Sequence, residues 1–155
     1  MRFIRRLGDK ISANQKELIV PLWKKFVEFL EYEESEVVST IYANLFNWII
    51  FLDVIDVQTF DLLILSAKNI TKEYDKQAAI EKLLKHVEIT PNEVGIIFLQ
   101  LLKGETLPFY KQESIREIVT ILYEHKEEKI ANEICEKYWN REMFFLQDIY
   151  EKYNC

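Results

Sequence analysis

Apolar residues recur along most of this chain at the spacing of amphipathic α-helices. Six segments carry them at offsets of 0, 3, 4 and 7, which places them on one face of a helix. The six segments are Phe60-Leu63-Ile64-Ala67, Ile80-Leu83-Leu84-Val87, Val94-Ile97-Phe98-Leu101, Ile115-Ile118-Val119-Leu122, Ala131-Ile134-Cys135-Tyr138 and Leu146-Ile149-Tyr150-Tyr153. Two further patterns lie upstream, Ile19-Leu22-Trp23-Phe26-Leu30 and Val38-Ile41-Leu45-Trp48-Leu52. The periodicity predicts an all-α protein of about eight helices.

Glycine and proline are too scarce for most other folds. The 155 residues include three glycines and three prolines, whereas these two residues make up about 12% of an average protein. β-Sandwiches and barrels need them in frequent turns, and nucleotide-binding sheets need glycine where phosphate approaches the backbone. Both classes are therefore excluded.

Four residues are typical of helix boundaries. Asp56 and Thr71 are predicted caps for the helices that follow them. Thr90, which precedes Pro91, has the pattern of a further helix start, and Gly104 is placed to end that same helix.

The helical segments also recur in pairs. They begin at residues 60, 80, 94, 115, 131 and 146, so every second segment starts 34, 35, 37 or 31 residues after its equivalent. This period is close to that of helix-hairpin repeats. A stack of hairpins (α-solenoid-like) and an orthogonal bundle both agree with it. No low-complexity linker interrupts the chain, so we expect one domain over residues 1–155, with residues 1–11 as a flexible basic segment.

Charge and cysteine content limit the location and the partners. The net charge is −6 and the isoelectric point about 5.1, which disfavours duplex DNA as a partner. The two cysteines, Cys135 and Cys155, do not form a disulfide framework and favour a reducing compartment. The longest uncharged run, residues 37–52, is shorter than the roughly 20 residues of a membrane span. We therefore expect a cytoplasmic protein with no transmembrane segment.

No motif for catalysis or for cofactor binding is present. His86 and His125 lack the Glu-x-x-His spacing of a metal-binding bundle, and neither cysteine belongs to a Cys-x-x-Cys pair. No serine lies in a Gly-x-Ser-x-Gly turn. We expect both histidines at the surface, Cys135 in the core, and no catalytic, cofactor-binding or metal-ligating residue.

Two surfaces are candidates for binding a partner. The first is an acidic corner between two helices that could attract a basic protein, and it consists of Glu28, Glu31, Glu33, Glu34 and Glu36. Its alternative is a solvated turn whose last carboxylates favour the next helix N-terminus. The second surface is aromatic and includes Trp139 and Phe144, which lie off the apolar stripes. Its alternative is a last helix that is buried on two sides.

A short segment near the start resembles a known family. Residues 11–18 read Ile-Ser-Ala-Asn-Gln-Lys-Glu-Leu and are followed by Trp23. This segment of about a dozen residues resembles the opening of the non-haem globin sensor domains of bacterial stress and sporulation signalling. The resemblance implies a closed helical bundle with an internal apolar pocket.

The sequence favours a non-enzymatic adaptor or regulatory module that binds another protein or a second copy of itself. The alternative implied by the resemblance is a globin-like ligand sensor. A second alternative is a nucleic-acid-binding protein or an enzyme whose site has no recognisable motif.

Overall fold

The computed structural model describes residues 13–30, 36–51 and 55–155, and this part of the chain is all-helical. Its eight helices are α2 (Ala13–Leu30), α3 (Glu36–Ile49), α4 (Val57–Asn69), α5 (Glu73–Leu83), α6 (Pro91–Leu101), α7 (Gln112–Glu124), α8 (Glu128–Trp139) and α9 (Gln147–Asn154). The predicted fold class is confirmed. The predicted flexible segment, residues 1–11, lies outside the described residues.

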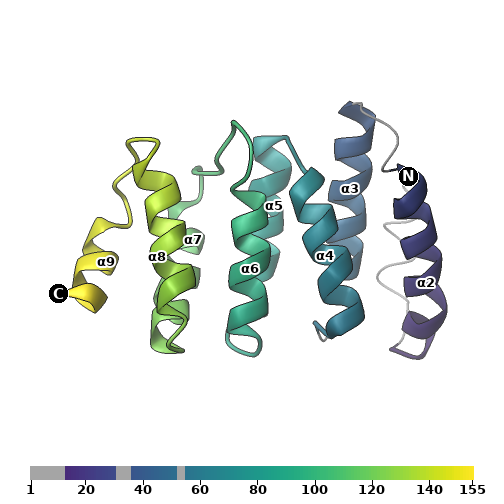
Figure 1. The fold of residues 1–155 in the computed structure, drawn as a ribbon, viewed down its shortest axis with the longest axis horizontal. Coiled ribbons are helices and arrows are strands. Elements are labelled where there is room, and N and C mark those ends of the chain that lie inside the picture. The colour runs from purple at the N-terminus through teal and green to yellow at the C-terminus, as the bar shows by residue number, and fades with distance from the viewer. Residues whose placement is uncertain (1–12, 31–35, 52–54) are drawn as a thin grey trace.

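The helices form two layers (Figure 1). One layer contains α2, α4, α6 and α8, and the other contains α3, α5, α7 and α9. Each helix packs on the next helix of its own layer, and most also pack on a chain neighbour in the other layer. Because each of these helices runs in the direction opposite to the one before it, the α4–α5, α6–α7 and α8–α9 connections lie together at one end of the array (Figure 1). The α3–α4, α5–α6 and α7–α8 connections lie at the opposite end.

Hydrogen bonds between successive helix pairs repeat the period read from the sequence. They join residues that are 32 to 37 positions apart: Ser39 with Thr71, Asn47 with Lys82, Ile50 with His86, Thr71 with Thr106, Glu88 with His125, Asn92 with Glu127, and Glu105 with Arg141. A helix pair is therefore the repeating unit. Of the two predicted arrangements, the structure has the stack of hairpins.

The apolar stripes face one continuous core between the two layers. Most stripe residues from Leu63 to Ile149 are buried, and Cys135 lies among them as predicted. Gly95 allows α6 to approach α8 closely, because a Cβ atom at this position would lie 2.6 Å from Cγ2 of Ile130. In the described ranges, no helix combines the length and the hydrophobicity that crossing a bilayer requires.

The predicted boundary of α4 is confirmed. The carboxylate of Asp56 accepts a hydrogen bond from the Thr59 backbone N–H (2.9 Å), and the Thr59 hydroxyl accepts one from the Asp56 N–H (2.8 Å). The prediction for Thr71 is wrong, because Lys72 is the N-cap of α5. The Thr71 backbone N–H and hydroxyl instead donate to Oγ of Ser39, both at 3.0 Å, and so join α3 to the α4–α5 connection.

The two ends of α6 also differ from the prediction in detail. Thr90 is the N-cap and Pro91 the first helical residue, but the Thr90 hydroxyl donates backward to the carbonyl of His86 (3.3 Å) and caps no N–H of α6. Gly104 has a φ of +90° and lies beyond the end of the helix at Leu101. It therefore shapes the α6–α7 connection rather than the last turn of α6.

Candidate functional site

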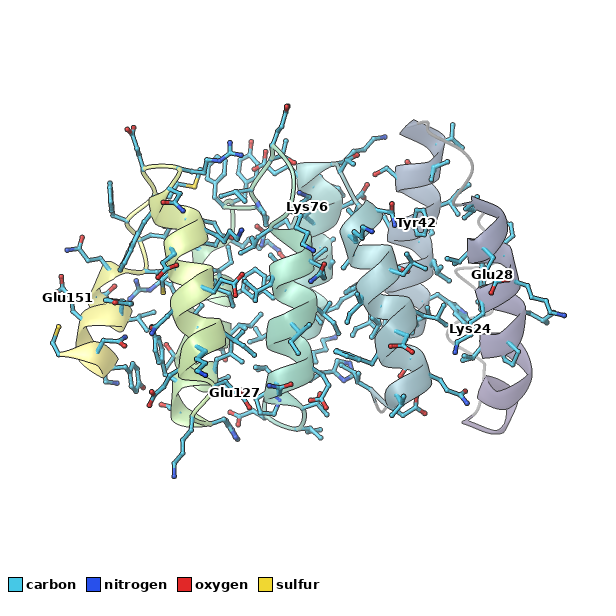
Figure 2. All side chains as sticks on the ribbon, in the orientation of Figure 1. Lys24, Glu28, Tyr42, Lys76, Glu127 and Glu151 are labelled. Carbon is cyan, nitrogen blue, oxygen red and sulfur yellow. The ribbon has the colours of Figure 1, made fainter. Side chains whose placement is uncertain are left out.

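The α6–α7 connection, residues 102–111, is held in place by a buried lysine of α5. Lys76 is 1% exposed, and its Nζ donates to the carbonyls of Lys103 (2.7 Å) and Thr106 (2.8 Å). Burial lowers the pKa of Lys76, and the nearby charge of Arg141 lowers it further. Figure 2 shows Lys76 in the half of the array near these connections. A charged donor fixes carbonyl groups more strongly than a neutral donor does.

Tyr138 of α8 and Arg141, which follows the end of that helix, bond to the same connection. The Arg141 guanidinium donates to the carbonyls of Glu105 (3.0 Å) and Gly104 (3.3 Å). The Tyr138 hydroxyl donates to the carbonyl of Pro108 (2.7 Å), and burial raises the pKa of Tyr138. Side chains from α5 and α8 thus fix the backbone of the connection almost residue by residue.

The fixed connection carries two adjacent aromatic residues. The rings of Phe109 and Tyr110 stack with centroids 4.8 Å apart and planes inclined by 18°. Tyr110 is 73% exposed, and Phe109 is partly exposed. Lys111 follows them and forms an ion pair with Glu81 of α5 (2.6 Å). The ring pair therefore projects from a backbone whose position is already determined.

Phe144 lies in the α8–α9 connection, at the same end of the array. It is 59% exposed and lines a hollow of about 520 Å³ together with Gln112, the first residue of α7. Arg116 of α7 holds the backbone next to Phe144, because it donates to the carbonyl of Phe145. Arg116 also donates to both carboxylate oxygens of Asp148 (2.7 and 2.5 Å), and these bonds lower the pKa of Asp148.

A fourth exposed ring belongs to Tyr74, which lies on the first turn of α5 and is 82% exposed. The three connections that carry or flank these rings are also joined to each other. The Thr106 hydroxyl donates to the carbonyl of Thr71 (2.8 Å), and Arg141 bonds to Glu105 as described. The α4–α5, α6–α7 and α8–α9 connections lie at one end of the array (Figure 1). Tyr74, Phe109, Tyr110 and Phe144 lie in or directly after these connections, and we refer to the four residues as the aromatic edge.

The aromatic surface predicted from the C-terminal sequence is mostly internal. Trp139 is half-buried and packs edge-to-face on Tyr150 with centroids 4.6 Å apart. Tyr138 is buried against Phe145 (4.9 Å). Because α9 packs on both α7 and α8, it covers residues that lie off the stripe of α8. Trp139 is therefore half-buried under α9, whereas Phe144 is exposed, and the binding of a partner by either residue stays a prediction.

The structure describes the acidic corner only in part. Glu28 lies exposed on α2, one turn beyond Lys24 (Figure 2), and Glu36 is the first residue of α3. Glu31, Glu33 and Glu34 lie outside the described residues. The acidic corner stays a prediction.

The two histidines and Cys135 contact other residues of the fold or are buried in it. His125 is exposed, and its Nε2 lies 3.1 Å from the carboxylate of Glu88. The prediction of a surface position is wrong for His86, which is half-buried and donates through Nε2 to the carbonyl of Ile50 (2.9 Å). Burial raises the pKa of Cys135 to about 11, so that this thiol is a poor nucleophile at neutral pH. Among the described residues, no group of three or more acidic, histidine or cysteine side chains is arranged to hold a metal ion.

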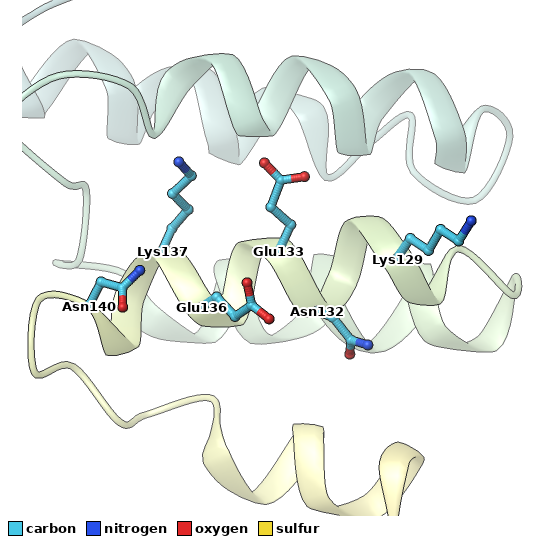
Figure 3. A pocket seen from close by; sticks show the side chains of 6 residues that line it. All are labelled: Lys129, Asn132, Glu133, Glu136, Lys137 and Asn140. Atoms are coloured by element: carbon cyan, nitrogen blue, oxygen red, sulfur yellow. The ribbon is translucent and has the colours of Figure 1, made fainter.

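The outer face of α8 provides a contrasting surface. It borders a hollow of about 540 Å³ lined by Lys129, Asn132, Glu133, Glu136, Lys137 and Asn140 (Figure 3). These side chains are polar or charged, with both signs of charge. A surface of this kind is typical of solvated helix faces.

No family model, curated protein or solved structure matches the chain. Sequence reasoning identified Phe144 but missed Tyr74, Phe109 and Tyr110. One signal was available, because Phe109 and Tyr110 are adjacent aromatic residues in the turn-like stretch that contains Gly104 and Pro108. Exposed aromatic residues in a connection are a stronger indication of binding than aromatic residues on a helix stripe.

Proposed function

We propose that this chain is a non-enzymatic protein-interaction module that binds a partner protein through the aromatic edge. One observation carries the proposal: the exposed rings of Phe109 and Tyr110 lie in a connection whose backbone is held by Lys76, Tyr138 and Arg141, and the exposed rings of Tyr74 and Phe144 lie at the same end of the array.

Exposed tyrosine and phenylalanine rings are suited to protein binding. Aromatic side chains supply large contact areas with few rotatable bonds, and they are common among the residues that dominate binding energies. Fixing them before binding lowers the entropy lost on association. The stacking of Phe109 on Tyr110 and the bonds of Lys76 and Arg141 to the loop supply this fixation.

The polar groups behind the edge favour binding over catalysis. Lys76, Arg141 and Tyr138 direct hydrogen bonds to backbone carbonyls of the connection, where they determine its shape. The exposed rings are therefore the groups that face outward. Stacked helix hairpins commonly serve as extended binding surfaces, which agrees with this role.

Site-specific photo-cross-linking in cells of the source organism tests the proposal. A photoreactive phenylalanine analogue replaces Tyr110 in one variant and Phe144 in another. A matched control places it at Lys129, on the outer face of α8 (Figure 3). We expect the first two positions to capture the same protein and the control position not to capture it.

The captured protein is then purified, and its affinity is measured directly. Combining Tyr110→Ser with Phe144→Ser should weaken binding by more than about tenfold, because these are the most accessible rings near the start of α7. Lys129→Ser should leave the affinity unchanged. Identical capture at all three positions, or an unchanged affinity in the double variant, contradicts the proposal.

A further inference from the structure

We draw no further inference here: the strongest candidate, the hollow of about 520 Å³ between α7 and α9 that Arg116, Phe144 and Glu151 line, belongs to the site already described, and the described residues around it do not show which chemical group would occupy it.

Discussion

Replacing Lys76 by methionine tests how the aromatic edge is held. The Lys76→Met substitution keeps the length of the side chain but removes the ammonium that donates to the carbonyls of Lys103 and Thr106. The unbranched apolar chain of methionine fits the same buried path. The α6–α7 connection thereby loses two of its side-chain hydrogen bonds while the helices around it stay intact.

The cost follows from two opposing contributions. Each hydrogen bond from a charged donor stabilises a protein by about 1.5–3 kcal/mol. Removing a buried ammonium recovers part of its desolvation cost, and water can reach carbonyls of a partly exposed connection. Two such bonds would contribute about 3–6 kcal/mol, and because both offsets reduce this sum we expect Lys76→Met to lower the free energy of unfolding by about 2 kcal/mol. For a chain of this length the expected fall in Tm is about 4–8 °C.

Chemical denaturation and limited proteolysis measure the two consequences. Denaturation gives the free energy of unfolding, and brief trypsin treatment reports cleavage after Lys103 and Lys111, at the two ends of the connection. We expect both sites to be cleaved faster in the variant, with sites on α8 such as Lys129 unchanged. An equally stable variant whose connection resists trypsin would refute the reasoning that Lys76 fixes the edge.

The remaining predictions concern pH, an unpaired amide and a tight helix contact. Burial lowers the pKa of Lys76 in the folded state below its ordinary value of 10.5, so between the folded and unfolded pKa values the unfolded chain binds more protons. The stability of the wild type relative to Lys76→Met should therefore rise as the pH increases toward 10.5. A difference in unfolding free energy that does not change with pH would argue against this linkage. Gln77 is buried, and neither polar atom of its amide has a hydrogen-bond partner within the described residues, so Gln77→Met should raise the free energy of unfolding by about 1 kcal/mol. A loss of stability measured by urea denaturation would show that the amide does bond to something. Gly95→Ala should lower stability by about 1 kcal/mol despite its better helix propensity, because the new Cβ meets Ile130. In an Ile130→Ala background the same change should become stabilising, and thermal melts that show an equal loss in both backgrounds would contradict the close contact.

Features that depend only on residues close together in the sequence could be predicted from the sequence. The helices follow from apolar spacing within a few turns, and the Asp56 cap of α4 follows from an aspartate placed just before the helix. The prediction failed for Thr71, although threonine is an equally good cap in sequence terms. Its partner is Ser39, 32 residues earlier, and local sequence contains no sign of that contact.

The candidate site also combines features that the local sequence predicts with features that contacts between distant residues decide. Trp139 and Phe144 both lie off the predicted apolar stripes, and the sequence offers no reason to separate them. The position of α9 separates them, because Tyr150 of α9 packs against Trp139 while Phe144 lies in the connection before that helix. Tyr110 was missed for a related reason, since its exposure depends on a connection held by Lys76 and Arg141.

The sequence by itself determined the helices and the period at which pairs of them recur, whereas the choice between a stack of hairpins and an orthogonal bundle came from the structure. A buried helix face can be recognised from apolar residues that recur at the period of the helix. A repeat of helix pairs can be recognised because successive pairs have similar patterns of apolar residues. The tertiary structure alone decided which rings reach the surface, and where. Side chains that reach across 27 to 37 residues set the course of the connections between the helices, and the aromatic edge exists because of those contacts.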